Sequence, residues 1–164
     1  MRKIILILSS VFVLAVLNFA IYEKEEVIEN GESVLLKLAP VDPRSLMQGD
    51  YMRLRYAIER EASKDGSISE QKRRGYLVIL PDENSVAHFI KFYNEEKLAK
   101  GEKLLRYRKP HDSSLQIVPD SFLFQEGHAK FYEKAEYGEF KFNDSGKHIL
   151  VGLVDEKYQG IVPE

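Results

Sequence analysis

Tyr51, Arg53 and Arg55 are the residues whose types and spacing best suit the binding of an anion. They alternate with apolar residues, and this period of two predicts a strand over about residues 51–60. One face would carry Met52, Leu54, Tyr56 and Ile58, and the other would carry Tyr51, Arg53, Arg55 and Glu59. Guanidinium groups bind carboxylates and phosphates through paired hydrogen bonds. The open face is therefore a candidate binding site for an anionic ligand.

A purely structural role for the same face is the alternative. Arg53 and Arg55 could form cross-strand ion pairs with Glu59 or Glu139 on a solvated surface. In that case the arginines would stabilise the sheet and bind no ligand.

The loop in front of this strand adds Asp42, Arg44, Gly49 and Asp50 to the candidate site. Glycine adopts a positive φ easily, so Gly49 suits the corner that leads into the strand. Asp50 is expected to accept hydrogen bonds from backbone amides of that turn rather than to act as a base.

A serine hydrolase of the signal-peptidase type is a further alternative, since such enzymes are membrane-anchored and β-rich and also carry a Gly-Asp pair before a strand. Their nucleophile lies upstream in a Ser-Met-x-Pro element, at a spacing that falls on Pro40 here. Ser45 lies closer to the pair, but it lacks that element and a clear lysine partner. The Gly-x-Ser-x-Gly motif of other hydrolases does not occur. We therefore predict no catalytic residue.

A second group of candidate residues lies near position 130. Apolar residues at helical spacing predict a helix over about residues 127–136, beginning just after Glu126 at Gly127. Glu126 could be functional, but a carboxylate there also complements the dipole of the helix. Tyr132 and Tyr137 are expected to be core or interface aromatics, because tyrosine titrates only near pH ~10.

Metal and cofactor sites are not predicted. The four histidines, His88, His111, His128 and His148, form none of the usual metal-binding motifs. The pairs Glu126–His128 and His111–Asp112 are the only metal-ligand candidates of note. The chain has no cysteine, which excludes zinc–thiolate sites and cysteine catalysis.

The remaining pattern predicts an α+β fold, mainly antiparallel β with one packed helix. The polar stretch 61–72 is predicted to be an exposed loop, and residues 110–114 another loop. Residues 137–142 and 148–155, joined by a turn at 143–146, form the clearest hairpin. Further strands are expected at residues 33–40, 75–81, 86–93, 104–108 and 115–118.

The N-terminal region predicts a membrane anchor. Residues 4–21 carry no charge, and as a helix they would be about 27 Å long, close to the ~30 Å hydrocarbon core of a bilayer. Arg2 and Lys3 precede this run and acidic residues follow it, which predicts cytoplasmic residues 1–3 and an extracytoplasmic C-terminal part.

A cleaved signal peptide is the alternative for this region, with Asn18-Phe19-Ala20 as the best cleavage sequence. The apolar part of a signal peptide is usually about 7–15 residues long, shorter than this run. We therefore favour an uncleaved signal anchor at residues 4–21, and either interpretation exports the domain.

Composition is consistent with a single exported domain after the anchor. We expect a charged connector over residues 22–32 and one domain over residues 33–164. Lys and Arg number 24 and Asp and Glu number 26, so the net charge of −2 offers no basic surface for nucleic acid.

The segment Gly49-Asp50-Tyr51-Met52-Arg53-Leu54-Arg55-Tyr56 resembles the signature of the GDYXXLXY family. The resemblance extends to Asp42-Pro43-Arg44, to residues 124–140, which include Glu126, Gly127, Tyr132, Tyr137 and Gly138, and to Leu150-Val151-Gly152-Leu153. It implies an exported, membrane-anchored bacterial protein, often encoded beside a polytopic membrane protein, and it implies no catalytic residue.

Two functions follow as expectations. The first is an accessory or interaction domain outside the cytoplasmic membrane, held to the bilayer by residues 4–21 and contacting a polytopic membrane protein. The alternative is a binding or sensor domain in which Arg53 and Arg55 hold an anionic component of the cell envelope.

Overall fold

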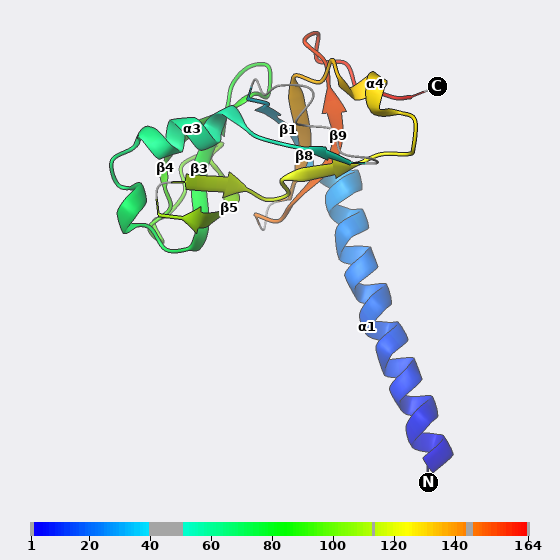
Figure 1. Ribbon diagram of the computed structural model, residues 1–164. Coiled ribbons are helices and arrows are strands. Elements are labelled where there is room, and N and C mark those ends of the chain that lie inside the picture. The colour runs from blue at the N-terminus through cyan, green and yellow to red at the C-terminus, as the bar shows by residue number, and fades with distance from the viewer. Residues whose placement is uncertain (1, 40–50, 113, 144–145, 164) are drawn as a thin grey trace.

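The computed structural model describes residues 2–39, 51–112, 114–143 and 146–163, and it shows one long helix attached to a β-rich domain (Figure 1). Helix α1, Arg2–Asn30, begins far from the domain and ends against its strands. The predicted connector is therefore helical as far as Asn30, and the domain begins directly after the helix.

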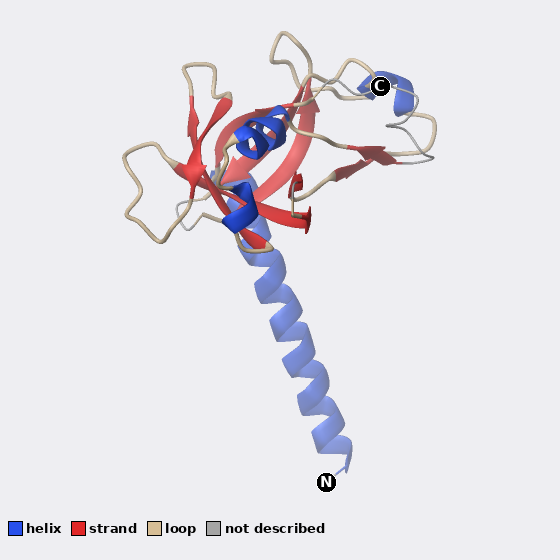
Figure 2. Cartoon of the chain, turned by 60° about the vertical axis from the view of Figure 1, so that its left-hand side comes forward, coloured by secondary structure: helices blue, strands red, loops and turns tan. Residues whose placement is uncertain are grey.

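Helix α1 is long and apolar enough to cross a membrane once. Every large apolar side chain from Ile4 to Ile21 is more than half exposed, and no other element packs along this part of the helix (Figure 2). Its polar side chains are satisfied within the helix: Ser10 donates to the carbonyl of Leu6 at 2.9 Å, and Asn18 donates to that of Leu14 at 2.8 Å. Such internal hydrogen bonds are what a lipid environment requires.

The domain contains three groups of antiparallel strands. The three-stranded sheet has the order β1-β8-β9, the ribbon pairs β2 with β7, and the four-stranded sheet has the order β4-β3-β5-β6. The strands are β1 Glu32–Lys37, β2 Tyr51–Arg53, β3 Arg74–Pro81, β4 Ala87–Phe92, β5 Lys103–His111, β6 Ser114–Ile117, β7 Ser121–Leu123, β8 Tyr137–Phe142 and β9 His148–Val154. The α+β fold and the β8–β9 hairpin are thus confirmed.

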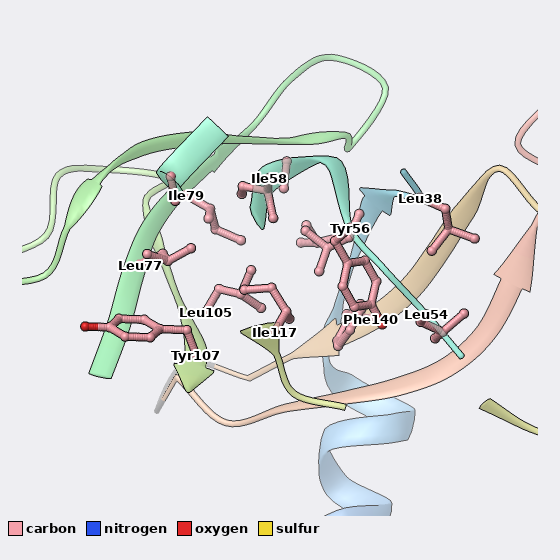
Figure 3. Packing of buried hydrophobic residues seen from close by; sticks show 14 of the residues in the cluster. Leu38, Leu54, Tyr56, Ile58, Leu77, Ile79, Leu105, Tyr107, Ile117 and Phe140 are labelled. Atoms are coloured by element: carbon pink, nitrogen blue, oxygen red, sulfur yellow. The ribbon is translucent and has the colours of Figure 1, made fainter. Parts of the chain in front are cut away.

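The core lies where the two larger sheets meet (Figure 3). Tyr56 lies between them, and its ring contacts Phe140 edge-on at a centroid distance of 5.8 Å. Other fully buried residues of this cluster come from both sheets and from the motif segment, namely Leu36, Leu54, Leu77, Ile79, Leu105 and Ile117.

The predicted strand over residues 51–60 is wrong beyond Arg53. Strand β2 ends there, and helix α3, Ala57–Lys64, begins after Tyr56. Residues 57–64 are mostly Ala, Glu, Arg and Lys, which favour helix. Ile58 and Ala62 are both buried and are four residues apart, as on one face of a helix. An apolar residue at position 58 therefore fits both the predicted strand and the observed helix.

The predicted helix over residues 127–136 is also wrong in length. Helix α4 is the single turn Ala129–Tyr132. Gly127 before it has a φ of +85°. The backbone of Glu136 after it already bonds Val154 of β9 and Leu38, the residue that follows β1. The predicted loop at 61–72 contains the second half of α3 and the 3-10 turn η1, Ile68–Glu70. Likewise, Pro110 and His111 of the other predicted loop belong to β5.

Candidate functional site

The motif strand β2 forms a short ribbon with β7. Tyr51 lies opposite Leu123, Met52 opposite Phe122, and Arg53 opposite Ser121. Residues directly opposite each other in an antiparallel pair share a face of the sheet. The ribbon therefore has an inner face with Met52 and Phe122 and an outer face with the other four residues.

The inner face attaches the ribbon to the domain. Met52 is buried, and the ring of Phe122 packs edge-on against Tyr132 of α4 at a centroid distance of 5.2 Å. Tyr132 also stacks on Phe124 at 5.3 Å. This aromatic group supports the ribbon without any contribution from the outer face.

The outer face of the ribbon, defined as Tyr51, Arg53, Ser121 and Leu123, is presented to solvent. The side chain of Leu123 is 77% exposed, and Arg53 and Ser121 are exposed as well. Tyr51 is half-buried. The predicted open face of the motif strand thus exists for Tyr51 and Arg53, and β7 adds a leucine and a serine to it that the motif alone did not indicate.

Leu54 and Tyr56, at the end of the motif, are core residues. Leu54 is 1% exposed and Tyr56 is 0% exposed. The Tyr56 hydroxyl donates a hydrogen bond to the carbonyl of Pro119 at 3.0 Å. Burial, together with the charges of Glu59 and Asp120, raises the pKa of Tyr56, so the hydroxyl remains a donor. These two residues position the ribbon and the start of α3.

A family model described as GDYXXLXY protein matches residues 13–153. The chain belongs to the GDYXXLXY family. No curated protein or solved structure is significantly similar to it. The matched range runs from Val13 within α1 to β9 and so includes the ribbon, the core and the β8–β9 hairpin.

The family signature thus joins two structural roles in this chain. Leu54 and Tyr56 build the core, whereas Tyr51 lies on the outer face of the ribbon. Gly49 and Asp50 of the signature lie outside the described residues, as do Asp42, Arg44 and Ser45. Their predicted roles remain predictions.

Arg55 and Glu59 form a second polar feature beside the motif, at the start of α3. Their side chains approach to 3.7 Å, and the Glu59 side chain is buried. One Glu59 carboxylate oxygen accepts a hydrogen bond from the backbone N–H of Ile117 at 2.9 Å. Burial raises the pKa of Glu59 to about 7, although this hydrogen bond and Arg55 oppose the shift.

The placement of Glu59 on a solvated face is therefore wrong, because this residue belongs to a helix and not to a strand. Glu59 lines a surface cavity of about 570 Å³ together with Arg55, Ser63 and Ser114. Ser114 Oγ is buried and has no hydrogen-bond partner among the described residues. The Glu59 carboxylate can take up one proton near neutral pH, and the cavity beside it can hold a small polar ligand.

The two motif arginines do not lie at one site. Arg53 is on the outer face of the ribbon, whereas Arg55 is past its end and pairs with Glu59. The cavity beside Arg55 is lined by Arg60 and Lys64 but not by Arg53. A single anion held by Arg53 and Arg55 together therefore has little geometric support.

The predicted site residues near position 130 also do not form one site, because some are packed in the domain and others are exposed. Tyr132 and Gly138 are buried, and Tyr137 packs on Tyr158 at a centroid distance of 5.3 Å. Glu126 and Gly127 are exposed in the loop before α4. Glu126 is not at the helix start as predicted, because α4 begins only at Ala129.

Lys109 is a buried charged residue that the sequence interpretation missed. Its ammonium group donates to the carbonyls of Ile68 at 2.7 Å, Gln71 at 3.0 Å and Ser69 at 3.4 Å. Every second residue of β5 from Leu105 to Lys109 is buried, namely Leu105, Tyr107 and Lys109. This period of two could have indicated that the side chain of Lys109 points inward. Because Lys109 caps η1, its role in the described chain is structural.

No group of three metal-ligating side chains gathers within the described parts of the chain. His128 contacts the ring of Phe131 at a centroid distance of 5.7 Å, and His88 pairs with Asp82 at 3.1 Å. The described residues thus form exposed surfaces and open surface cavities around a well-packed core.

Proposed function

We propose that this protein is an accessory subunit of a membrane complex, anchored by α1, whose domain lies outside the cytoplasm and contacts a polytopic membrane protein through the outer face of the ribbon. The charge distribution supports this orientation, because Arg2 and Lys3 precede the apolar run and Glu23, Glu25 and Glu26 follow it.

The exposure of Leu123 carries the proposal. This side chain is 77% exposed although its neighbour Phe122 packs inward, so the fold does not need it. Tyr51 lies directly opposite it and Arg53 follows on the same face. Tyrosine and arginine are enriched in protein contact surfaces, and the exposed leucine adds apolar area between them.

The ribbon is also firmly supported, which favours binding without a large loss of conformational freedom. The backbone N–H of Leu54 donates to the carbonyl of Asp120 at 2.9 Å, and this bond extends the β2–β7 pairing toward the core. A contact surface that is ordered before binding loses less entropy when the partner docks.

Cysteine substitutions can test both the side of the membrane and the contact. The chain has no native cysteine, so Leu123→Cys provides a single thiol. Leu98→Cys is the matched control, because Leu98 is also an exposed leucine (36%) but lies in the loop between β4 and β5.

We expect a membrane-impermeant maleimide to label the Leu98→Cys variant in intact cells, because Leu98 lies outside the proposed contact. A photo-crosslinker attached to the thiol of the Leu123→Cys variant should yield one adduct with an integral membrane protein, identified by mass spectrometry. The same crosslinker on the Leu98→Cys variant should yield no such adduct.

Labelling of Leu98→Cys that requires permeabilised cells would contradict the proposed orientation. Identical adducts at both positions, or none at position 123 in native membranes, would contradict the proposed contact.

A further inference from the structure

A cavity of about 610 Å³ lies at the junction of α1 and the domain. The last turns of α1 contribute Glu23, Lys24 and Val27 to its wall, and the start of β9 contributes His148 and Ile149. Strand β5 adds Arg106. This juxtamembrane cavity shares no lining residue with the outer face of the ribbon.

The position of the cavity along α1 places it at the level of lipid headgroups. Glu23, Lys24 and Val27 follow Ile21, the last residue of the apolar run, by two to six positions. With a rise of 1.5 Å per residue, this is roughly 3–9 Å above the apolar segment. The headgroup layer is about 5–7 Å thick on each side of the hydrocarbon core.

The cavity carries uncompensated positive charge. Lys147 and Glu23, which both line the cavity, pair with each other. By contrast, no carboxylate of the described chain forms an ion pair with Lys24 or Arg106. Both of these side chains are exposed, so they can reach an anion at the mouth of the cavity.

The remaining lining is largely apolar. Its apolar lining residues are Val27, Leu104, Val118, Pro119 and Ile149. The ring of His148 stacks on Phe142 at a centroid distance of 5.0 Å, and its buried Nδ1 has no hydrogen-bond partner among the described residues. A free inorganic anion would make no use of these apolar walls.

We propose that the juxtamembrane cavity binds the phosphate group of a membrane phospholipid. The guanidinium group of Arg106 and the ammonium group of Lys24 contact the phosphate oxygens. The glycerol backbone and the first acyl carbons lie against Val118 and Ile149. A lipid in this position fixes the domain relative to the membrane surface, whether or not the outer face of the ribbon binds a partner.

Native mass spectrometry of the full-length protein in detergent micelles tests this site. The probe is phosphatidylglycerol, and a galactosyl diacylglycerol with the same acyl chains serves as the phosphate-free lipid. Arg106→Gln removes the cavity guanidinium, and Arg106→Lys keeps the charge. Arg108→Gln is the matched control, because Arg108 is exposed on the same strand but pairs with Asp120 at 2.7 Å and does not line the cavity.

We expect one tightly retained phosphatidylglycerol per chain and about a tenfold loss of its affinity in Arg106→Gln, as for the loss of a charge-assisted hydrogen bond. Arg106→Lys should retain most of the affinity, and Arg108→Gln should match the wild type. A thermal unfolding curve for each variant verifies that it is folded.

Equal retention of phosphatidylglycerol by the wild type and Arg106→Gln would overturn the proposal. Equal retention of the phosphate-free lipid by the wild type would also overturn it. Displacement of the lipid by millimolar inorganic phosphate would instead assign the cavity to a soluble anion.

Discussion

A Cβ atom placed on Gly138 would lie 3.2 Å from Cε1 of Tyr56, so the glycine of β8 leaves the space that the motif tyrosine occupies. The same Cβ would lie 3.2 Å from a methyl group of Leu150. The GDYXXLXY signature and the start of β8 are far apart in the chain. They meet in the core because the ring of Tyr56 packs directly against the backbone of Gly138.

Gly138→Ala is expected to lower the free energy of unfolding by about 1–2 kcal/mol, as overpacking of a filled core does. The Tyr56 ring is fully buried and cannot move aside easily. Urea unfolding of the full-length protein in detergent, followed by tyrosine fluorescence, measures the change. Gly152→Ala is the control, because its nearest neighbour lies at 3.9 Å, and a loss as large in this variant would contradict the explanation.

Tyr56→Phe should cost about 1 kcal/mol of stability. The substitution keeps the ring but removes the hydroxyl that donates to the Pro119 carbonyl at 3.0 Å. The same unfolding measurement applies, with Tyr22→Phe in the exposed part of α1 as the control. Unchanged stability in Tyr56→Phe would show that the hydrogen bond contributes nothing net.

The contribution of Glu59 to the stability of the domain should fall as the pH rises from about 4.5 to about 7. Burial raises the folded-state pKa of Glu59 from 4.5 to about 7, so the folded protein binds more protons than the unfolded chain in this window. The contribution of this group amounts to roughly 3 kcal/mol between the ends of the window.

Glu59→Gln removes this titration and keeps an oxygen that can accept from the Ile117 amide. Burial lowers the pKa of His148, which gives an opposite slope at acidic pH, so the informative quantity is the difference between variant and wild type. Unfolding free energies across the pH range should converge toward acidic pH and diverge toward neutral pH. The exposed Glu61→Gln should follow the wild type, and parallel curves for Glu59→Gln would refute the assignment.

Lys109→Met should destabilise the protein by about 2 kcal/mol, as expected when hydrogen bonds from a buried charged group are lost. The variant leaves the carbonyls of Ile68, Ser69 and Gln71 without their shared donor. Amide hydrogen exchange should accelerate locally around η1. Wild-type protection of residues 68–71 in the variant would show that Lys109 does not hold this turn.

Local patterns were sufficient to predict the parts of this chain that depend on neighbouring residues. The uncharged run at residues 4–21 predicts a helix suited to a membrane, because the required length and composition lie in one continuous segment. The β8–β9 hairpin follows from two alternating segments and a short connection. The signature residues likewise identified the family before any tertiary contact was known.

Local periodicity was not sufficient where one pattern fits two structures. The alternation from Met52 to Ile58 suits a strand, yet Ile58 begins the buried face of α3. Glu59 is buried there because the helix turns it toward the backbone of Ile117, a residue of β6. Sequence spacing contains no information about that distant acceptor.

The sequence by itself thus determined the long apolar N-terminal helix, the fold class and most of the strands, since each depends on composition or on periods of a few residues. Only the tertiary structure decided that Leu123 stands beside Tyr51, that Gly138 makes room for Tyr56, and that the end of α1 closes a cavity with β5 and β9. These relationships depend on which strands pair and how the sheets pack, and both are set by the burial of the whole core rather than by any local segment.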